Sequence, residues 1–180
     1  MKTLCFLFLF LCGVMPAFSL DVHSLPLHRI EAEKVRTEEK KILLEGSVVA
    51  VLDLGTMTCG KAIVTMNETS KREKKEDLTR LLDMEQHVEV RFTDGGFLSA
   101  DHGIVDCVKS EGVFWGSDTE KVIYETALVE KGKKSLMRAS SHCLRGRLVK
   151  TEAGWTLDDL NAEGAVCIEY RPEEGKSHEE

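Results

Sequence analysis

His102 is the side chain in this sequence best suited to acid–base chemistry, because carboxylates lie near it along the chain at Asp101 and Asp106. A carboxylate that hydrogen-bonds to an imidazole orients the ring and raises its basicity, which is how a general base is built. Adjacent residues on a strand point to opposite faces, so Asp101 reaches His102 only if the backbone turns there, whereas Asp106 could approach instead. No G-x-S-x-G or H-E-x-x-H motif accompanies the histidine. The pattern leaves open a hydrolase that uses His102 as its base.

Cysteine is the second residue type that could carry chemistry. Four cysteines follow the N-terminal leader described below: Cys59, Cys107, Cys143 and Cys167. An even number in an exported chain predicts two disulfide bonds, and the three possible pairings stay open. A thiolate pair between His142 and Cys143 is the alternative, which a disulfide at that sulfur would prevent. The long spacings and the lack of a C-x-x-C motif argue against a zinc site or a redox dithiol. We expect no metal site and no cofactor.

The two tryptophans, Trp115 and Trp155, are candidates for the lining of a ligand pocket, because aromatic rings supply much of the contact area in such sites. The alternative is that both belong to the core. The formal charge of −7 argues against nucleic acids and anionic membranes as partners, since both favour a basic surface. The expected partner is therefore an extracellular protein or a small ligand.

Residues 1–19 have the features of a secretory signal peptide. Lys2 supplies a positive start, and the apolar run that follows is too short to span a bilayer. Small residues at Ala17 and Ser19 favour cleavage after Ser19. We expect a secreted protein with no membrane-inserted segment. In that setting Asn67, in the sequon Asn67-Glu68-Thr69, is a candidate glycosylation site.

The elements that must position these residues centre on residues 86–107. Apolar residues alternate with polar ones from Val88 to Phe92, which predicts a half-buried strand. The segment Asp94-Gly95-Gly96 suits a tight turn, and the return strand is expected to end near Cys107.

Further strands are predicted in segments that are apolar or alternating: 42–54, 57–66, 121–130, 142–150 and 167–170. Residues 113–116 are expected to form a short aromatic strand or a turn. The segment from Ser70 to Glu85 predicts an amphipathic helix, with a capping-box start and leucines on one face. A short helix is expected from Thr156, with Gly164 as its end.

Together these elements predict a mainly β fold, α+β at the margin: an antiparallel sandwich or barrel of about seven to nine strands, with one amphipathic helix packed on it. We expect residues 20–41 to form a charged arm or marginal helix, 42–171 a single domain, and 172–180 a disordered acidic tail. The favoured function is an extracellular binding or interaction protein without catalytic activity. The alternatives are the secreted hydrolase that uses His102, and a small secreted protease inhibitor or other effector.

Overall fold

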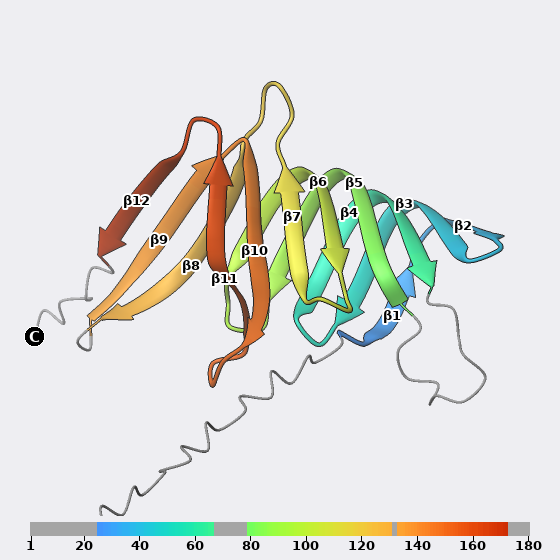
Figure 1. Ribbon diagram of the computed structural model, residues 1–180, viewed down its shortest axis with the longest axis horizontal. Helices are drawn as coiled ribbons and strands as arrows, with labels where there is room; N and C mark the ends of the chain where they lie inside the picture. Colours follow the sequence, from blue (N-terminus) through green and yellow to red (C-terminus); the bar gives the residue numbers. More distant parts are fainter. Residues whose placement is uncertain (1–24, 67–78, 131–132, 173–180) are drawn as a thin grey trace, which may run out of the picture.

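A computed structural model describes residues 25–66, 79–130 and 133–172 of the chain, and within them every regular element is a β-strand (Figure 1). All the strand pairs are antiparallel. The predicted mainly β, antiparallel fold is confirmed. The strands in chain order are β1 (Leu27–Glu31), β2 (Lys34–Glu38), β3 (Lys41–Leu52), β4 (Gly55–Met66), β5 (Thr79–Phe92), β6 (Phe97–Asp106), β7 (Glu111–Trp115), β8 (Val122–Glu130), β9 (Lys133–Ser141), β10 (Cys143–Lys150), β11 (Trp155–Glu163) and β12 (Cys167–Pro172).

The sheet divides at β6. Residues 97–99 of β6 pair with β8, and residues 102–106 pair with β7. One arm therefore runs through β7, β10 and β11, and the other runs through β8, β9 and β12. On its other side β6 pairs with β5, which continues to β4 and β3, and both β1 and β2 pair with β3. Figure 1 shows the β12 arm as the outlying part of the sheet, next to β11 and β10.

A line of irregularities bends the middle of the sheet. The register shifts between Glu45 and Val48 of β3, and again between Glu85 and Val88 of β5. The inserted residues have positive φ, as left-handed bulge positions do: Gly46, Ser47, Gln86 and His87. Bulges bend a strand and increase its twist. Because the bulges lie on nearby strands, the sheet can curl so that one of its faces encloses a core.

Contacts between two distant turns join parts of the sheet that lie far apart in its strand order. The backbone N–H of Trp155 donates to the Thr93 hydroxyl at 2.6 Å, and the N–H of Asp94 donates to the Trp155 carbonyl at 3.3 Å. The turn between β5 and β6 is thereby joined to the turn between β10 and β11. Residues from both arms share one hydrophobic core, which includes Phe114 of β7 and Tyr124 of β8.

The central hairpin forms as the sequence predicts. β5 pairs with β6, and the side chains of Val88, Val90 and Phe92 are buried. The turn is closed by the Phe92 N–H, which donates to the Gly96 carbonyl at 2.9 Å, and Gly95 takes a φ of 92°. Positive φ is the reason that glycine suits this position. The predicted strands at 42–54 and 57–66 are also confirmed, as β3 and β4.

Phe114 sits over two glycines on neighbouring strands. It lies opposite Gly103 of β6, and its ring also covers Gly112 of its own strand. A Cβ atom added at Gly103 would lie 2.6 Å from the ring, and one at Gly112 would lie 2.7 Å from it. The absence of side chains at these positions lets the phenylalanine ring pack flat against the sheet.

The predicted helix over 70–85 is not found in the described residues. Its last seven positions, 79–85, belong to β5, and residues 70–78 lie outside the described residues. In β5 the side chains of Leu82 and Met84 are buried, and Asp83 between them is on the opposite face. The leucine at position 81 obscures this alternation, because two adjacent leucines also fit one side of a helix. Pairing with β4 and β6 decides between the two patterns.

Two more segments differ from expectation. The short helix predicted from Thr156 is the strand β11, which pairs with β10 along its length. Part of the expected N-terminal arm forms β1 and β2, whose backbone groups complete the ladder along β3. The leader, Asn67 and the tail from residue 173 lie outside the described residues, so these predictions are not tested. No helix long and apolar enough to cross a membrane occurs in the described part of the chain.

Candidate functional site

The chemically versatile side chains form a row across the face of the sheet that points away from the core. Lys61 of β4 lies opposite Glu85 of β5, and Glu85 lies opposite His102 of β6. His102 lies opposite Trp115 of β7, which lies opposite Cys143 of β10. Directly opposed residues on neighbouring strands project from the same face. We call these five residues the outer-face row.

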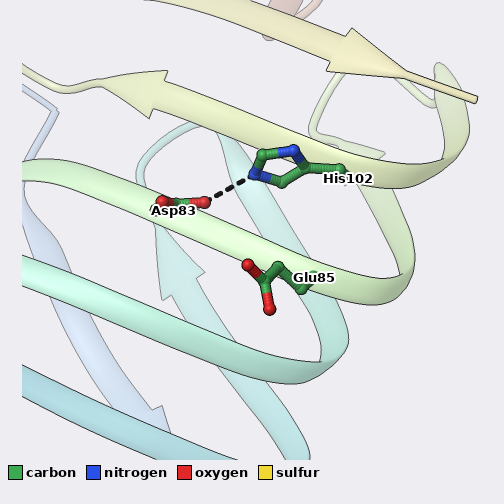
Figure 2. Close-up of side chains that lie close together, drawn as sticks. All are labelled: Asp83, Glu85 and His102. Carbon is green, nitrogen blue, oxygen red and sulfur yellow. Dashed lines mark hydrogen bonds and ion pairs between the residues drawn. The ribbon is translucent and has the colours of Figure 1, made fainter.

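His102 is held from two sides. It donates a hydrogen bond from Nε2 to Oδ1 of Asp83 at 2.7 Å, and Figure 2 shows this contact between neighbouring strands. Its ring also stacks on Trp115, with ring centroids 5.0 Å apart and an angle of 27° between the planes. The side chains of His102 and Asp83 are 35% and 29% exposed, so solvent reaches the pair. The imidazole is therefore fixed in orientation and still accessible.

Glu85 completes a cluster of three possible metal ligands. It projects from the same strand as Asp83, and one ligand atom from each of Asp83, Glu85 and His102 lies within 4.8 Å of the other two (Figure 2). Glu85 also accepts a hydrogen bond from Lys61 Nζ at 3.1 Å. The arrangement can position a base or bind a cation, and its three ligands stand on the central strands β5 and β6.

The carboxylate that hydrogen-bonds to His102 is that of Asp83, and not that of Asp106 as the sequence suggested. Asp106 lies on the same strand as His102, and its Oδ1 accepts bonds from the backbone N–H groups of Val108 and Lys109, both at 3.0 Å. Asp106 thus stabilises the turn between β6 and β7. Asp83 was missed because the helix predicted over 70–85 removed it from the sheet. A strand pattern at 79–92 would have kept Asp83 in the sheet, and the bulge between Glu85 and Val88 then brings it to the same face as His102.

A groove lies on the other face of the sheet, where the two arms separate. It has a volume of about 330 Å³. Its walls come from β8 and β9 on one side, and from β11 with the turn before it on the other. The lining residues are Asp94, Tyr124, Thr126, Ala127, Leu128, Met137, Thr151, Ala153, Thr156, Leu157, Asp158 and Leu160.

Tyr124 joins the two walls of this groove. Its hydroxyl donates to the Leu157 carbonyl at 3.2 Å and lies 3.1 Å from the Thr156 hydroxyl. Burial raises the pKa of Tyr124 above its ordinary value, and the hydrogen bond with Thr156 only partly offsets this. The phenol therefore stays protonated, and it remains a hydrogen-bond donor at neutral pH.

The face that forms the groove becomes more exposed toward the sheet edge. Leu98, Tyr124, Ala139 and Ile168 lie opposite one another across four strands. The first three are buried, whereas Ile168 on the edge strand β12 is 53% exposed. Tyr170, two residues further along β12, is 63% exposed. The β12 arm thus presents apolar surface that the β11 arm does not cover.

Neither tryptophan lines this groove. Trp115 is part of the outer-face row, on the opposite face of the sheet. Trp155 is buried in the core at 5% exposure, and its neighbours Ala153, Thr156 and Leu157 form the groove wall. The predicted pocket lining by Trp115 and Trp155 is therefore not found at this groove.

All four cysteines carry free thiols in this structure. Burial raises the pKa of Cys59 to about 11 and that of Cys107 to about 12. Cys59 lies between residues that pair with Glu85 and Glu89 of β5, whereas the Cys107 N–H donates to the Arg80 carbonyl. These positions on β5 are roughly 20 Å apart at the usual rise per residue, beyond the reach of a disulfide. Of the three possible pairings, the one that contains a Cys59–Cys107 bond is thus incompatible with the sheet.

No family model, curated protein or solved structure matches this chain.

Proposed function

We propose that this protein is an extracellular binding protein without catalytic activity, which takes a small and mainly apolar ligand in the groove between β11 and the β8–β9 hairpin. The groove is the observation that carries this proposal. Its volume of about 330 Å³ falls in the range of small-molecule sites. Leu128, Met137 and Leu160 supply apolar contacts, while Tyr124 and Thr156 offer polar groups.

Export is part of the same proposal. The leader at residues 1–19 directs the chain to an oxidising compartment, where disulfide bonds form and where Asn67 is available for glycosylation. Cys143 and Cys167 are the more exposed thiols, so they are the first candidates for oxidation. Cys59 and Cys107 are buried in the core, and their pairing would require movement of the strands around them.

The test uses N-phenyl-1-naphthylamine, an uncharged dye whose fluorescence rises in apolar sites. We expect saturable binding to the full chain, with a loss of about tenfold or more in M137W, because the larger ring fills the groove. Trp115→Phe is the matched control, since it changes an aromatic residue on the other face. A dye response that is absent, or equal in M137W and in the parent, would rule out the groove as a ligand site.

The hydrolase is the second candidate, and the 2.7 Å contact between His102 and Asp83 favours it. A carboxylate that orients an imidazole is half of a general-base arrangement. The groove lies on the opposite face, so an enzyme would have to bind its substrate on the outer-face row. We expect His102→Ala to leave dye affinity unchanged within about twofold, because groove and histidine share no contact. A loss of hydrolytic activity toward an ester substrate in this variant would favour the enzyme.

A further inference from the structure

We propose that Asp83, Glu85 and His102 form a binding site for a divalent transition-metal ion, with Zn²⁺ as the ion that fits them best. The site lies on the opposite face of the sheet from the groove, and it does not depend on the function proposed above. The spacing of these residues in the sequence does not suggest metal binding. Only the pairing of β5 with β6 brings them together.

The ligand set is characteristic of zinc. An imidazole nitrogen and two carboxylate oxygens are common zinc ligands, at about 2.0–2.2 Å from the ion, and they leave further positions open to water. Such distances place ligand atoms roughly 3–4 Å apart. The three candidate atoms already lie within 4.8 Å of one another. Small side-chain rotations are therefore enough to close them around an ion. Calcium and magnesium prefer oxygen ligands alone, so the histidine selects against both.

The scaffold holds the three ligands ready for metal. Asp83 and Glu85 are two residues apart on β5, so their side chains point to the same face. His102 stands opposite Glu85 on β6, and Trp115 stacks on its ring. Binding converts the Asp83–His102 hydrogen bond into two metal–ligand bonds, and the ring proton moves from Nε2 to Nδ1. No change in the backbone is needed.

When no metal ion is bound, the ammonium group of Lys61 forms an ion pair with Glu85. Its ammonium group lies 3.1 Å from Glu85, and both side chains are partly exposed, at 32% and 45%. A metal ion must compete with this ammonium for the carboxylate. Removing the lysine charge should therefore strengthen metal binding, whereas removing any of the three ligands should weaken it.

The chain contains a matched control in a second His–Asp pair. His28 lies 2.5 Å from Asp53, on strand β1 and just after β3 respectively, and both are exposed. Among the described residues, this pair has no third ligand close enough to complete a metal site. The His28–Asp53 pair therefore tests whether a histidine–carboxylate contact is enough by itself to bind zinc.

The experiment is calorimetric titration of the untagged chain with Zn²⁺. Cys143→Ser and Cys167→Ser are present throughout, so that accessible thiols do not bind the ion. We expect one zinc per chain, with affinity reduced about tenfold or more in D83N, E85Q and H102Q. H28Q should retain the parent affinity, K61M should bind several-fold more tightly, and Mg²⁺ should not bind at the same concentration. Circular dichroism shows whether each variant is folded. If H102Q does not fold, D83N still tests the site, because asparagine has nearly the same shape as aspartate.

Trp115 adds an optical test. Zinc at His102 should change the tryptophan emission of the parent chain, and W115F should lose this change while it keeps the calorimetric signal. The proposal is overturned if no zinc binds at millimolar concentration, or if binding is equal in the parent, D83N and H102Q. Weaker binding by K61M would remove Glu85 from the ligand set. Loss of dye binding in the groove would not affect these results.

Discussion

The outer-face row and the groove use the same sheet in opposite ways. The row crosses its central strands, where each residue has a neighbour on both sides and where pairing fixes the position of every side chain. The groove lies where the arms diverge, and its walls meet through side chains such as Tyr124. Polar chemistry that needs fixed distances is thus placed on the continuous part of the sheet. The groove, with its apolar side chains, lies where the sheet divides.

The first way to test this contrast is to compare two neighbours on β7. Phe114 is fully buried over Gly103 and Gly112, whereas Trp115 points to the outer face. We expect Phe114→Ala to lower the free energy of unfolding by about 3–5 kcal/mol, because it leaves a cavity that the glycines cannot fill. Trp115→Ala should cost about half as much or less, since its ring is only partly buried. Urea denaturation measures both. Equal costs would mean that the outer face is also part of a core.

A second comparison, between a buried and an exposed cysteine, uses the dependence of the free energy of unfolding on pH. Burial raises the pKa of Cys107 from 9.0 to about 12, so between these values the thiol loses its proton in the unfolded chain but keeps it in the folded one. The unfolded state then binds fewer protons, and stability falls as pH rises from 9 to 12. We expect this group to account for roughly 2–4 kcal/mol of the fall.

The measurement is the free energy of unfolding of the reduced protein at several pH values. Cys107→Ala should flatten the alkaline decline, because no thiol remains there to ionise. Cys167→Ala should leave the decline as it is, since Cys167 is exposed. If the two variants show the same pH dependence, Cys107 is not shielded from water as the structure has it.

The parts of the fold that the sequence predicts are those that neighbouring residues decide. Val88, Val90 and Phe92 alternate with polar residues, and the Asp94-Gly95 turn follows at once, so the hairpin is evident locally. By contrast, Leu82 is a strand residue because β4 and β6 pair on either side of it, and no nearby residue signals this.

The candidate sites follow the same division. His102 is recognisable as a residue type, but its partner Asp83 depends on the strand that the local pattern misassigned. The groove depends on β8 meeting β11, which are separated in the chain by β9 and β10. Such long-range packing leaves no periodic signal in either strand. Trp155 was predicted to line a pocket, but the residues near it in the chain line the groove instead.

The comparison with the smallest expected change in the free energy of unfolding alters one hydrogen-bonding group on each face. Tyr124→Phe deletes the hydroxyl that donates to the Leu157 carbonyl in a buried contact, and it leaves that carbonyl without this donor. We expect a loss of about 1–2 kcal/mol in the free energy of unfolding. Asp83→Asn weakens the contact with His102, where solvent reaches both side chains, so we expect about 0–1 kcal/mol.

Tyr124→Phe and Asp83→Asn should also differ in which ligand they bind less tightly. Tyr124→Phe should weaken dye binding in the groove and leave zinc affinity as it is, and Asp83→Asn should do the reverse. Each face then acts as the control for the other, because β6 is common to both and any general disturbance of the sheet would change both signals. A variant that reduces dye and zinc binding together would show that the two faces are coupled through β6, and that the outer-face row and the groove are not independent.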